Sequence, residues 1–544
     1  MPPGKEICGA LKYDNTVRAV VMPLALGLAL ACGILIGRFA RFTGWHDGKL
    51  GYGFGRKMED IRQFLLNNYV DSLDAEDLDG LAINALLESL DPHSGYIRPK
   101  DYEAAYEDLH GTFEGIGIEF NILADTIVVV SVIPGGPSEL SGILPGDRII
   151  RVDDTLVAGV GITSDQVMKL LRGPKGTQVK VELVRAGGRP FTVTLRRAKI
   201  PVNSVEAALS IDKTGYIRLS RFSDDTFNEF LQAFKKLDSA DIEALILDLR
   251  NNPGGLLDQA VAVADFFLPK GTLIVSTRGA HRKEVRYMSQ NRFGYSDIPL
   301  AVLINRGSAS ASEIVAAALQ DNDRALIAGE PSFGKGLVQE EITFPDGSAL
   351  RITVARYYTP SGRCIQRDYE EVNSFKYYHR FPPGDTIQKT TSDPKPYSTR
   401  GGRSVYAGGG IMPDVIANAQ MDKEMDLLSV NPTLASRLNE FALEQADRHR
   451  EIWKKKYPTY KAFFKDALQL SRLVEAFSER VADIFLSQED NEKIPHLLKA
   501  LVARYVWGNE AFYFITLQHD ILFKQVLSQL KNNNFRPSKN SVNE

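Results

Sequence analysis

Ser310 and Lys335 are the two residues of this 544-residue sequence whose types and surroundings could together support nucleophilic chemistry. The apolar run Leu300–Ile304 indicates a buried strand, and apolar residues recur at helical spacing after Ala311. Ser310 therefore lies where a strand passes into a helix. There its hydroxyl can be exposed beside the first free backbone N–H groups of the helix.

The same serine also fits a purely structural role. Ser310 and Glu313 have the spacing of a capping box, and a serine before an apolar run usually does no more than cap a helix. Ser308 or Ser312 could equally be the functional serine of this stretch. Because a serine hydroxyl is a weak nucleophile, only a base beside it would favour chemistry over capping.

Lys335 is the candidate base, because no histidine stands near Ser310 with an acidic partner in a recognisable order. A lysine acts as a base only when it is neutral, so its pKa must fall from about 10.4 toward about 7–8. That fall requires the fold to disfavour the charged form by roughly 3–5 kcal/mol. Phe333, Leu337 and Val338 can exclude water here, although a lysine between glycines is otherwise most often a solvated loop charge.

Three segments around these residues resemble the carboxyl-terminal processing peptidases, or tail-specific proteases, which use a Ser–Lys dyad. The segments are Gly307–Glu313, Ala316–Asp321 and Phe333–Gln339. In that family the nucleophile is the middle serine of the triplet and the lysine follows 25 positions later, as Lys335 follows Ser310 here. The resemblance also implies that Gln339, four positions after the lysine, holds its amine.

The resemblance further implies an oxyanion hole at the turn Asn251–Gly255. This turn follows the buried strand Ala244–Leu249, at the carboxyl end where open α/β sheets bind ligands. A tetrahedral oxyanion needs two N–H donors at about 2.7–3.1 Å. The family places one donor at the glycine pair and one at Ala311, and the sequence leaves the choice between Gly254 and Gly255 open.

Residues 106–200 are expected to form a compact β-rich module with a helix capped by Thr163 and Gln166. Strand patterns there are separated by Gly- and Pro-containing turns. The pattern resembles a PDZ domain, which binds the C-terminus of a peptide as an added strand.

The resemblance places the carboxylate-binding loop of this module at Gly115, Ile116, Gly117 and Ile118. Glycines there allow close approach of the peptide. Arg172 is the candidate for a family arginine that couples peptide binding to the active site. Without the surrounding module, the loop could be a plain β-turn and Arg172 a surface residue at a helix end.

An uncharged apolar run of 19 residues, Ala19–Gly37, indicates a membrane-spanning helix. It would span roughly 28 Å, close to the hydrocarbon core of about 30 Å. Ala29–Cys32 faintly resembles a lipoprotein site, but the apolar run continues to Ile36, which argues against cleavage. We expect an uncleaved anchor with the bulk of the chain on the periplasmic or extracytoplasmic side of the cell envelope, a direction that rests on the resemblance.

The composition gives no reason to expect nucleic acid as a partner, because the net charge is −3 with 24% charged residues. Histidines are scattered and no HExxH occurs, so neither a metal nor another cofactor is expected. Cys364 is expected to be an inert thiol. Gly329–Gly336 nearly spells a P-loop, but it lacks the Ser/Thr that binds Mg²⁺ and precedes a β-hairpin, which argues against an NTPase.

Strand–helix alternation after Pro201 predicts an α/β core with a largely parallel sheet, and the resemblance implies a crotonase-like fold. The expected fold class is thus an α/β crotonase-like peptidase core, α+β as a whole, with an inserted PDZ domain, an N-terminal transmembrane helix and a helical C-terminal region. The expected parts are a cytoplasmic segment (1–18), the anchor (19–37), a helical region (54–105), the PDZ domain (106–200), the peptidase domain (201–420) and a helical domain (421–544).

Three details complete these expectations. His93, in an Asp91–Tyr96 stretch that also resembles the family, is interpreted as a turn residue. Residues 369–401 are expected to form a long surface excursion. The C-terminal helices could pack on the catalytic domain or build a homodimer or higher oligomer, and the sequence leaves this open.

These observations predict a membrane-anchored serine endopeptidase that recognises unfolded or C-terminally exposed proteins by their tails through the PDZ domain. Ser310 would form an acyl-enzyme, with Lys335 moving the proton. Two other classes remain open: an inert, membrane-tethered PDZ scaffold, and acyl-CoA chemistry on the same fold.

Overall fold

The computed structural model describes residues 53–185, 188–369, 396–417, 431–481, 484 and 487–532. The chain divides into two compact units, residues 1–83 and 84–544. The expected anchor at 19–37 lies outside the described residues, as does most of the expected excursion at 369–401. Within the described ranges, no helix is both long enough and apolar enough to cross a bilayer.

Helices form in the first unit and at the start of the second, where the spacing of apolar residues predicts them. α2 (Phe54–Asn68) and most of α3 (Ala75–Glu88) belong to the first unit. The second unit continues through β1 (Gly95–Ile97) and α4 (Pro99–His110).

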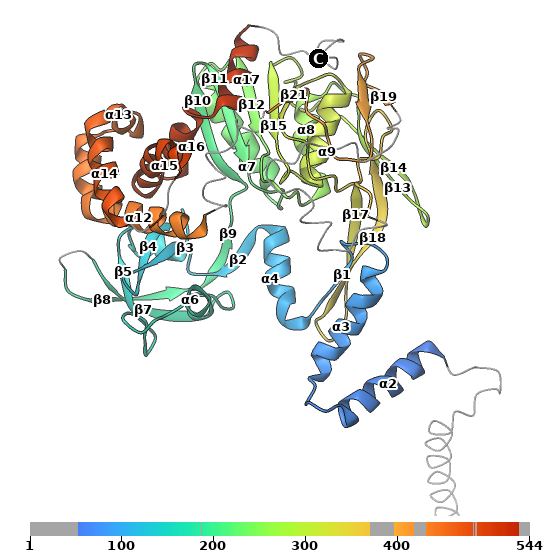
Figure 1. The fold of residues 1–544 in the computed structure, drawn as a ribbon, viewed down its shortest axis with the longest axis horizontal. Coiled ribbons are helices and arrows are strands. Elements are labelled where there is room, and N and C mark those ends of the chain that lie inside the picture. Colours follow the sequence, from blue (N-terminus) through green and yellow to red (C-terminus); the bar gives the residue numbers. More distant parts are fainter. Residues whose placement is uncertain are drawn as a thin grey trace, which may run out of the picture. The chain divides into compact units, whose positions relative to one another are not determined.

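The β-rich module is a six-stranded antiparallel sheet in the order β3-β4-β5-β7-β8, with β6 beside β5 (Figure 1). Its elements are β3 (Ile118–Leu123), β4 (Thr126–Val132), α5 (Pro137–Leu140), β5 (Arg148–Val152), β6 (Thr155–Leu156), α6 (Ser164–Leu171), β7 (Gln178–Val184) and β8 (Phe191–Arg196). The capping box predicted at Thr163 and Gln166 is confirmed at the start of α6. β2 (Thr112–Gly115) pairs with β9 (Ala198–Pro201) where the chain enters and leaves. β3 lies at the edge of the sheet and leaves one side open for pairing.

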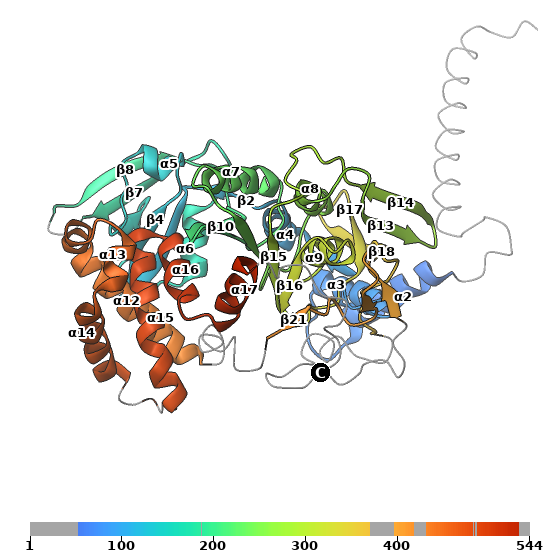
Figure 2. The same cartoon turned by 90° about the horizontal axis from the view of Figure 1, so that it is seen from above.

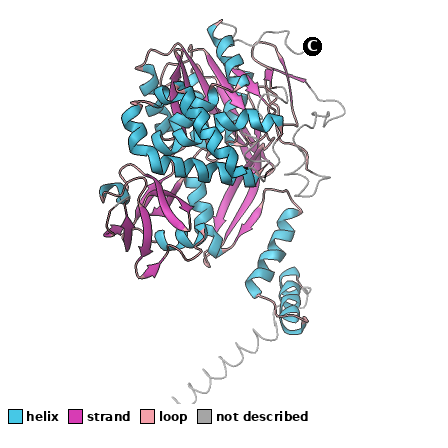
Figure 3. Cartoon of the chain, turned by 60° about the vertical axis from the view of Figure 1, so that its left-hand side comes forward, coloured by secondary structure: helices cyan, strands magenta, loops and turns pink. Residues whose placement is uncertain are grey.

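The main peptidase sheet has six strands in the order β10-β11-β12-β15-β16-β21. They are β10 (Val205–Ile211), β11 (Thr214–Leu219), β12 (Ala244–Asp248), β15 (Leu300–Ile304), β16 (Leu326–Gly329) and β21 (Val415–Ile416). Only β10 and β11 pair antiparallel, so the largely parallel sheet that the sequence predicts is confirmed. Figure 3 shows the helices and strands of the chain by type.

Helices cover both faces of this sheet because its strands are apolar on both sides. One face packs against α7 (Thr226–Asp238), α8 (Leu257–Phe267) and α9 (Ala311–Asp321). The other packs against α17 (Ile521–Lys531), as Figure 2 shows. A helix from the far end of the chain is therefore part of the peptidase core.

A second sheet adjoins the first and has the order β1-β18-β13-β14, with β17 also paired to β18. Its remaining strands are β13 (Leu273–Gly279), β14 (Arg282–Met288), β17 (Leu337–Thr343) and β18 (Ala349–Tyr358). The hairpin predicted for β17 and β18 is confirmed. The sequence analysis missed β14, an exposed strand with three charged residues in a row, whose pattern lacks a buried face.

The C-terminal region is helical, as predicted, and it packs on the rest of its own chain. Its elements are α12 (Pro432–Lys456), α13 (Tyr460–Lys465), α14 (Ala467–Ser478), a 3₁₀ turn (Glu479–Val481), α15 (Gln488–Trp507), α16 (Asn509–Leu517) and α17. α12 and α15 share a core with Leu123, Val128 and Val130 of the β-rich module. Short strands β19 (Pro396–Ser398) and β20 (Ser404–Tyr406) pair with each other.

Candidate active site

Ser310 lies at the junction of β15 and α9, in the position that the sequence predicts. Its φ is 53° and its ψ is −113°, a conformation that costs a residue with a side chain of order 1–3 kcal/mol. The residue is 9% exposed, so most of its surface is covered by the rest of the protein. Ser310 also occupies the N-cap position of α9, so the structural and the chemical interpretation apply to the same residue.

The other two serines of the triplet have structural roles. The Ser308 hydroxyl donates to the carbonyl of Leu249 at 2.8 Å, and the Ser312 hydroxyl donates to the carbonyl of Asn252 at 2.9 Å. Both residues are fully buried. These contacts favour Ser310 among the three candidates that the sequence left open.

Glu313, which the sequence analysis treated only as the acidic half of a capping box, is an organising residue of the site. Its carboxylate is fully buried and accepts hydrogen bonds from the backbone N–H groups of Ser310, Gly334 and Lys335 at 2.9, 2.7 and 2.8 Å. The Ser332 hydroxyl donates to it as well, at 2.5 Å. Burial raises the pKa of this carboxyl, and the donated hydrogen bonds oppose that rise.

This carboxylate links the backbone of Ser310 to the backbone of Lys335. The N–H groups of Ser310 and Lys335 bind the same oxygen, Glu313 Oε2. Their nitrogen atoms therefore lie within about 6 Å of each other. A residue pair 25 positions apart is thus joined through one buried acceptor.

Lys335 is partly buried, and its amine donates to Gln339 Oε1 at 2.9 Å. Burial lowers the pKa of Lys335, and the nearby Arg351 guanidinium lowers it further. The carboxylates of Asp91 and Glu313 act in the opposite direction. The net effect is a pKa of Lys335 below the ordinary lysine value, which favours the neutral amine that a base requires.

The orientation of Gln339 is set by a residue far away in the sequence. Its amide nitrogen donates to the His93 carbonyl at 2.6 Å. Because a carbonyl can only accept, this contact directs the amide oxygen of Gln339 toward Lys335. The contact between Gln339 and the lysine amine, which the resemblance implied, is present. The hydrogen bond from Gln339 to the His93 carbonyl was not predicted.

A compact turn fixes the His93 carbonyl. Asp91 Oδ1 accepts from the backbone N–H groups of His93 and Ser94, both at 2.8 Å, and Asp91 Oδ2 accepts from the Ser94 hydroxyl at 2.7 Å. Burial lowers the pKa of His93 to about 4, and the nearby Lys335 lowers it too, so the ring is neutral at pH 7. His93 is a turn residue, as interpreted, and the Asp-x-x-Ser spacing was the available signal for the turn.

Gly254 lies against the nucleophile loop, whereas Gly255 lies against the backbone of Phe222. A Cβ atom on Gly254 would come within 2.8 Å of Ser310 Cβ and of the Ala311 nitrogen. The Gly254 N–H donates to Asn252 Oδ1 at 2.9 Å, whereas no hydrogen bond occupies the N–H of Gly255 or of Ala311 among the described residues. This arrangement favours Gly255 and Ala311 as the two free donors.

Four of the five predicted PDZ residues, Gly115, Ile116, Gly117 and Ile118, lie at the start of the β-rich module. Ile116 is buried, and its carbonyl accepts from both the N–H and the hydroxyl of Ser138, which fixes the loop. Gly117 has a φ of 76°, a value that favours glycine. The Ile133 N–H donates to its carbonyl, and Ile118 begins β3.

Arg172 follows α6 and faces the start of the module. Its guanidinium pairs with Glu107 of α4 at 2.7 Å and lies 4.8 Å from the centre of the Phe113 ring. Its Cα atom is next to Gly115, since a Cβ on that glycine would lie 3.7 Å away. Arg172 thus connects the module to α4.

An open cleft of about 890 Å³ lies beside the 91–94 turn. Its lining includes Asp91, Leu337, Thr353 and the basic side chains Arg278 and Arg356. This volume is in the range of ligand-binding clefts. In the part of the chain that the structure describes, no group of three or more His, Cys, Asp or Glu side chains could hold a metal ion.

Three family models match the chain. Peptidase family S41 matches residues 213–374, a range that contains Ser310, Lys335, Gly255 and Ala311. A PDZ domain model matches 128–185, which begins after the predicted carboxylate-binding loop. Residues 434–508 match a family of unknown function, DUF8443.

Solved structures of two related proteins are similar to parts of the chain. The photosystem II D1 C-terminal processing protease is 31% identical, with 68% of this chain and 88% of that one covered and a TM-score of 0.34. The PDZ domain of a carboxy-terminal protease from Vibrio cholerae, solved with a peptide, is 37% identical over 16% of this chain and 97% of its own, with a TM-score of 0.16.

Curated relatives match a little more than half of the chain. The carboxy-terminal-processing protease of Bartonella bacilliformis is 42% identical over 313 residues, 56% of this chain and 71% of that one. The carboxy-terminal processing protease CtpA of Bacillus subtilis is 36% identical over 57% of this chain and 66% of its own. Given this identity and coverage, together with the S41 and PDZ matches, the chain belongs to the carboxy-terminal-processing proteases, serine peptidases of family S41.

Proposed function

We propose that this serine peptidase cleaves proteins with a Ser310–Lys335 dyad after its PDZ domain has bound their C-terminal tails. The observation that carries the dyad is the shared carboxylate. Glu313 Oε2 accepts hydrogen bonds from the backbone of both residues. Lys335 is partly buried, and its amine donates to Gln339. A buried lysine whose pKa is lowered, and whose backbone is linked to that of a strained serine, is a candidate for a catalytic group.

The reaction follows from these contacts. Ser310 Oγ attacks the carbonyl carbon of the scissile peptide bond, and its proton passes to the neutral amine of Lys335. The backbone N–H groups of Gly255 and Ala311 donate to the oxyanion. Lys335 gives the proton to the leaving amine, and water then releases the acyl group from Ser310, with Lys335 again taking a proton.

Substrate recognition would use the open edge of the PDZ sheet. The segment Gly115–Ile118 runs into β3, and among the residues that the structure describes no strand pairs with the outer side of β3. A peptide that binds its terminal carboxylate at this loop can therefore add as a strand along β3. The Vibrio cholerae relative was solved with a peptide, which supports the same use of this module. Arg172 would couple peptide binding to the active site through its ion pair with Glu107 of α4.

Two finer features belong to this proposal. The parallel sheet with helices on both faces supports a crotonase-like core. The uncharged run Ala19–Gly37 supports an anchor that holds the enzyme at the extracytoplasmic side of a membrane.

The test is cleavage of an unstructured protein that ends in apolar residues. Wild type should cleave it, whereas Ser310→Ala and Lys335→Ala should not, with unchanged folding by circular dichroism. A matched substrate ending in two aspartates should be cleaved more slowly, through a higher KM. Full activity of Ser310→Ala would refute the assignment of the nucleophile. If wild type binds the tail of the substrate but does not cleave it, the protein is better described as an inert PDZ scaffold. Binding of an acyl-CoA thioester would favour acyl-CoA chemistry on the same fold.

A further inference from the structure

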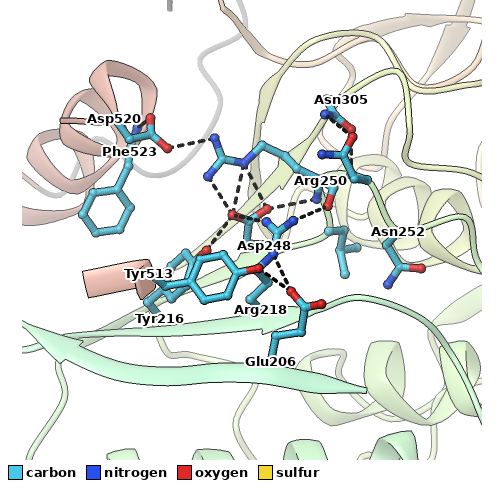
Figure 4. Close-up of polar contacts among 12 residues, drawn as sticks. Glu206, Tyr216, Arg218, Asp248, Arg250, Asn252, Asn305, Tyr513, Asp520 and Phe523 are labelled. Atoms are coloured by element: carbon cyan, nitrogen blue, oxygen red, sulfur yellow. Dashed lines mark hydrogen bonds and ion pairs between the residues drawn. The ribbon is translucent and has the colours of Figure 1, made fainter. Parts of the chain in front are cut away.

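Arg250 stands directly before the oxyanion turn and is held by the C-terminal helices. It follows β12 by two residues, and its side chain is only 10% exposed. Its guanidinium binds Asp248 Oδ2 at 2.7 Å and Asp520 Oδ2 at 2.8 Å, as Figure 4 shows. Asp520 is the N-cap of α17, where its other oxygen accepts from the Phe523 N–H at 2.8 Å.

The main chain of Arg250 is held by a residue of the main sheet that itself contacts the C-terminal helices. Arg218 of β11 donates to the Arg250 carbonyl at 3.1 Å. The Arg218 guanidinium lies 5.0 Å from the centre of the Tyr513 ring and pairs with Glu206 at 3.1 Å. The Tyr513 hydroxyl, from α16, donates to the same Glu206 (Figure 4).

Arg218, Asp248, Arg250 and Asp520 form a buried cluster of charged side chains. Asp248 is fully buried and pairs with both Arg250 and Arg218, which keep its pKa at about 2 despite its burial. The hydroxyl of Tyr216, whose ring packs edge-on against Phe523 of α17, also donates to Asp248, at 2.8 Å. Because buried charges need their partners, loss of one partner should shift the others.

The cluster continues into the oxyanion turn. The Asn251 N–H donates to Asn305 Oδ1 at 2.8 Å, which joins the turn to the end of β15. The Asn252 side chain accepts from the Gly254 N–H, and the Asn252 carbonyl accepts from Ala309 and Ser312 of the nucleophile loop. A displacement of Arg250 would therefore move the turn relative to Ser310.

We propose that Asp520 is a positioning residue for the peptidase reaction. Through its ion pair with Arg250, it fixes the position of the oxyanion turn relative to Ser310. This inference rests on the proposed function, because it concerns the oxyanion hole of that reaction. Asp520 and Tyr513 lie beyond the residues that the S41 model (213–374) and the DUF8443 model (434–508) match. The C-terminal helices thus supply a part of the catalytic site that the family core alone lacks.

The experiment compares Asp520→Asn with wild type and with Glu510→Gln in the full chain. Asparagine keeps the cap of α17 but loses the charge that faces Arg250. Glu510→Gln is the matched control, because it weakens a surface ion pair between α16 and Lys236 of α7 without touching the cluster. We expect Asp520→Asn to lower kcat about tenfold with KM within about twofold, and Glu510→Gln to change neither.

Two further readouts separate positioning from general stability. Affinity for a peptide aldehyde, whose adduct with Ser310 places an oxyanion in the hole, should fall about tenfold, while the affinity of Ser310→Ala for the uncleaved peptide should not change when Asp520→Asn is added. In an Arg250→Met background, Asp520→Asn should have little additional effect on kcat.

The inference is overturned if Asp520→Asn lowers the melting temperature but leaves kcat and aldehyde affinity at wild-type values. It is also overturned if the two substitutions act additively on kcat. If wild type does not cleave, or if Ser310→Ala remains active, the proposed function fails and this inference fails with it. If wild type cleaves, Ser310→Ala does not, and Asp520→Asn equals wild type, only this inference fails.

Discussion

The two halves of the catalytic site are held in place by different parts of the chain. The half with Lys335 is held by Glu313, in the same motif, and by the 91–94 turn through Gln339. The half with the oxyanion turn is held by Arg250, the residue directly before the turn, whose partners include Asp520 near the C-terminus. The proposed base is therefore held mainly by residues near it in the peptidase core, whereas the residue before the proposed oxyanion turn also contacts a C-terminal helix.

This difference has a physical origin. A lysine amine must be partly desolvated and needs one oriented acceptor, which short-range contacts can provide. The backbone N–H groups of a turn must be aimed precisely, so the turn is fixed by the side chain of Asn252 and also at its ends, one of which is Arg250. Substitutions in the two halves should consequently have effects of different size and kind.

The largest effect is expected for Lys335→Met, which keeps the length of the side chain and removes the base. kcat/KM should fall by about 10³-fold or more, because Ser310 would lose the acceptor of its proton. Lys283→Met, at an exposed position of β14, is the control and should behave as wild type. Retention of more than a tenth of the activity by Lys335→Met would show that another group is the base.

A smaller loss, with a loss of stability, is expected for Glu313→Gln. The amide has one acceptor oxygen instead of two, so at least one donor among Ser310, Ser332, Gly334 and Lys335 would lose its partner. We expect kcat to fall about 10²-fold and the free energy of unfolding to fall by about 2–4 kcal/mol. Steady-state kinetics and urea denaturation measure the two. A stable, fully active variant would contradict the joining role of this carboxylate.

Gln339→Leu should have a lesser effect, confined to the base half. The amine of Lys335 would lose its oriented acceptor but keep its buried surroundings, so kcat should fall about tenfold. Binding of a peptide aldehyde, which reports on the oxyanion half, should fall less than kcat. An equal loss in both would mean that the two halves are not separate.

Two substitutions should move the pH dependence in opposite directions. Activity requires neutral Lys335, so kcat/KM should rise with pH up to the pKa of this residue, which lies below the ordinary lysine value. Arg351 lowers that pKa and Asp91 raises it. Arg351→Gln should therefore move the rising limb to higher pH, and Asp91→Asn to lower pH. Shifts in the same direction would exclude Lys335 as the titrating group.

The smallest effect is expected for Tyr513→Phe, in the oxyanion half. The ring beneath Arg218 stays and only the hydroxyl contact with Glu206 is lost, so kcat should fall about two- to threefold with KM unchanged. Pre-steady-state measurement of acylation would resolve this change. A rise in KM alone would place the contact outside the catalytic turn.

Local patterns were enough to predict several parts of this protein. The strand before Ser310 and the helix after it follow from apolar periodicity, and the Thr163–Gln166 capping box follows from spacing. The pairing of Ser310 with Lys335 followed from the resemblance of short motifs. The exposed strand β14 was missed because its side chains carry no buried face.

The sequence by itself determined the elements and the two residues that could do chemistry, because periodicity and motif spacing are properties of neighbouring residues. Only the tertiary structure showed which groups hold them. The His93 carbonyl reaches Gln339 across 246 positions, and Asp520 reaches Arg250 from the other end of the chain. A backbone carbonyl carries no side-chain signature, and an aspartate that caps a helix looks the same in the sequence whether its second oxygen faces water or a buried arginine. These roles therefore depend on how the folded chain brings distant residues together.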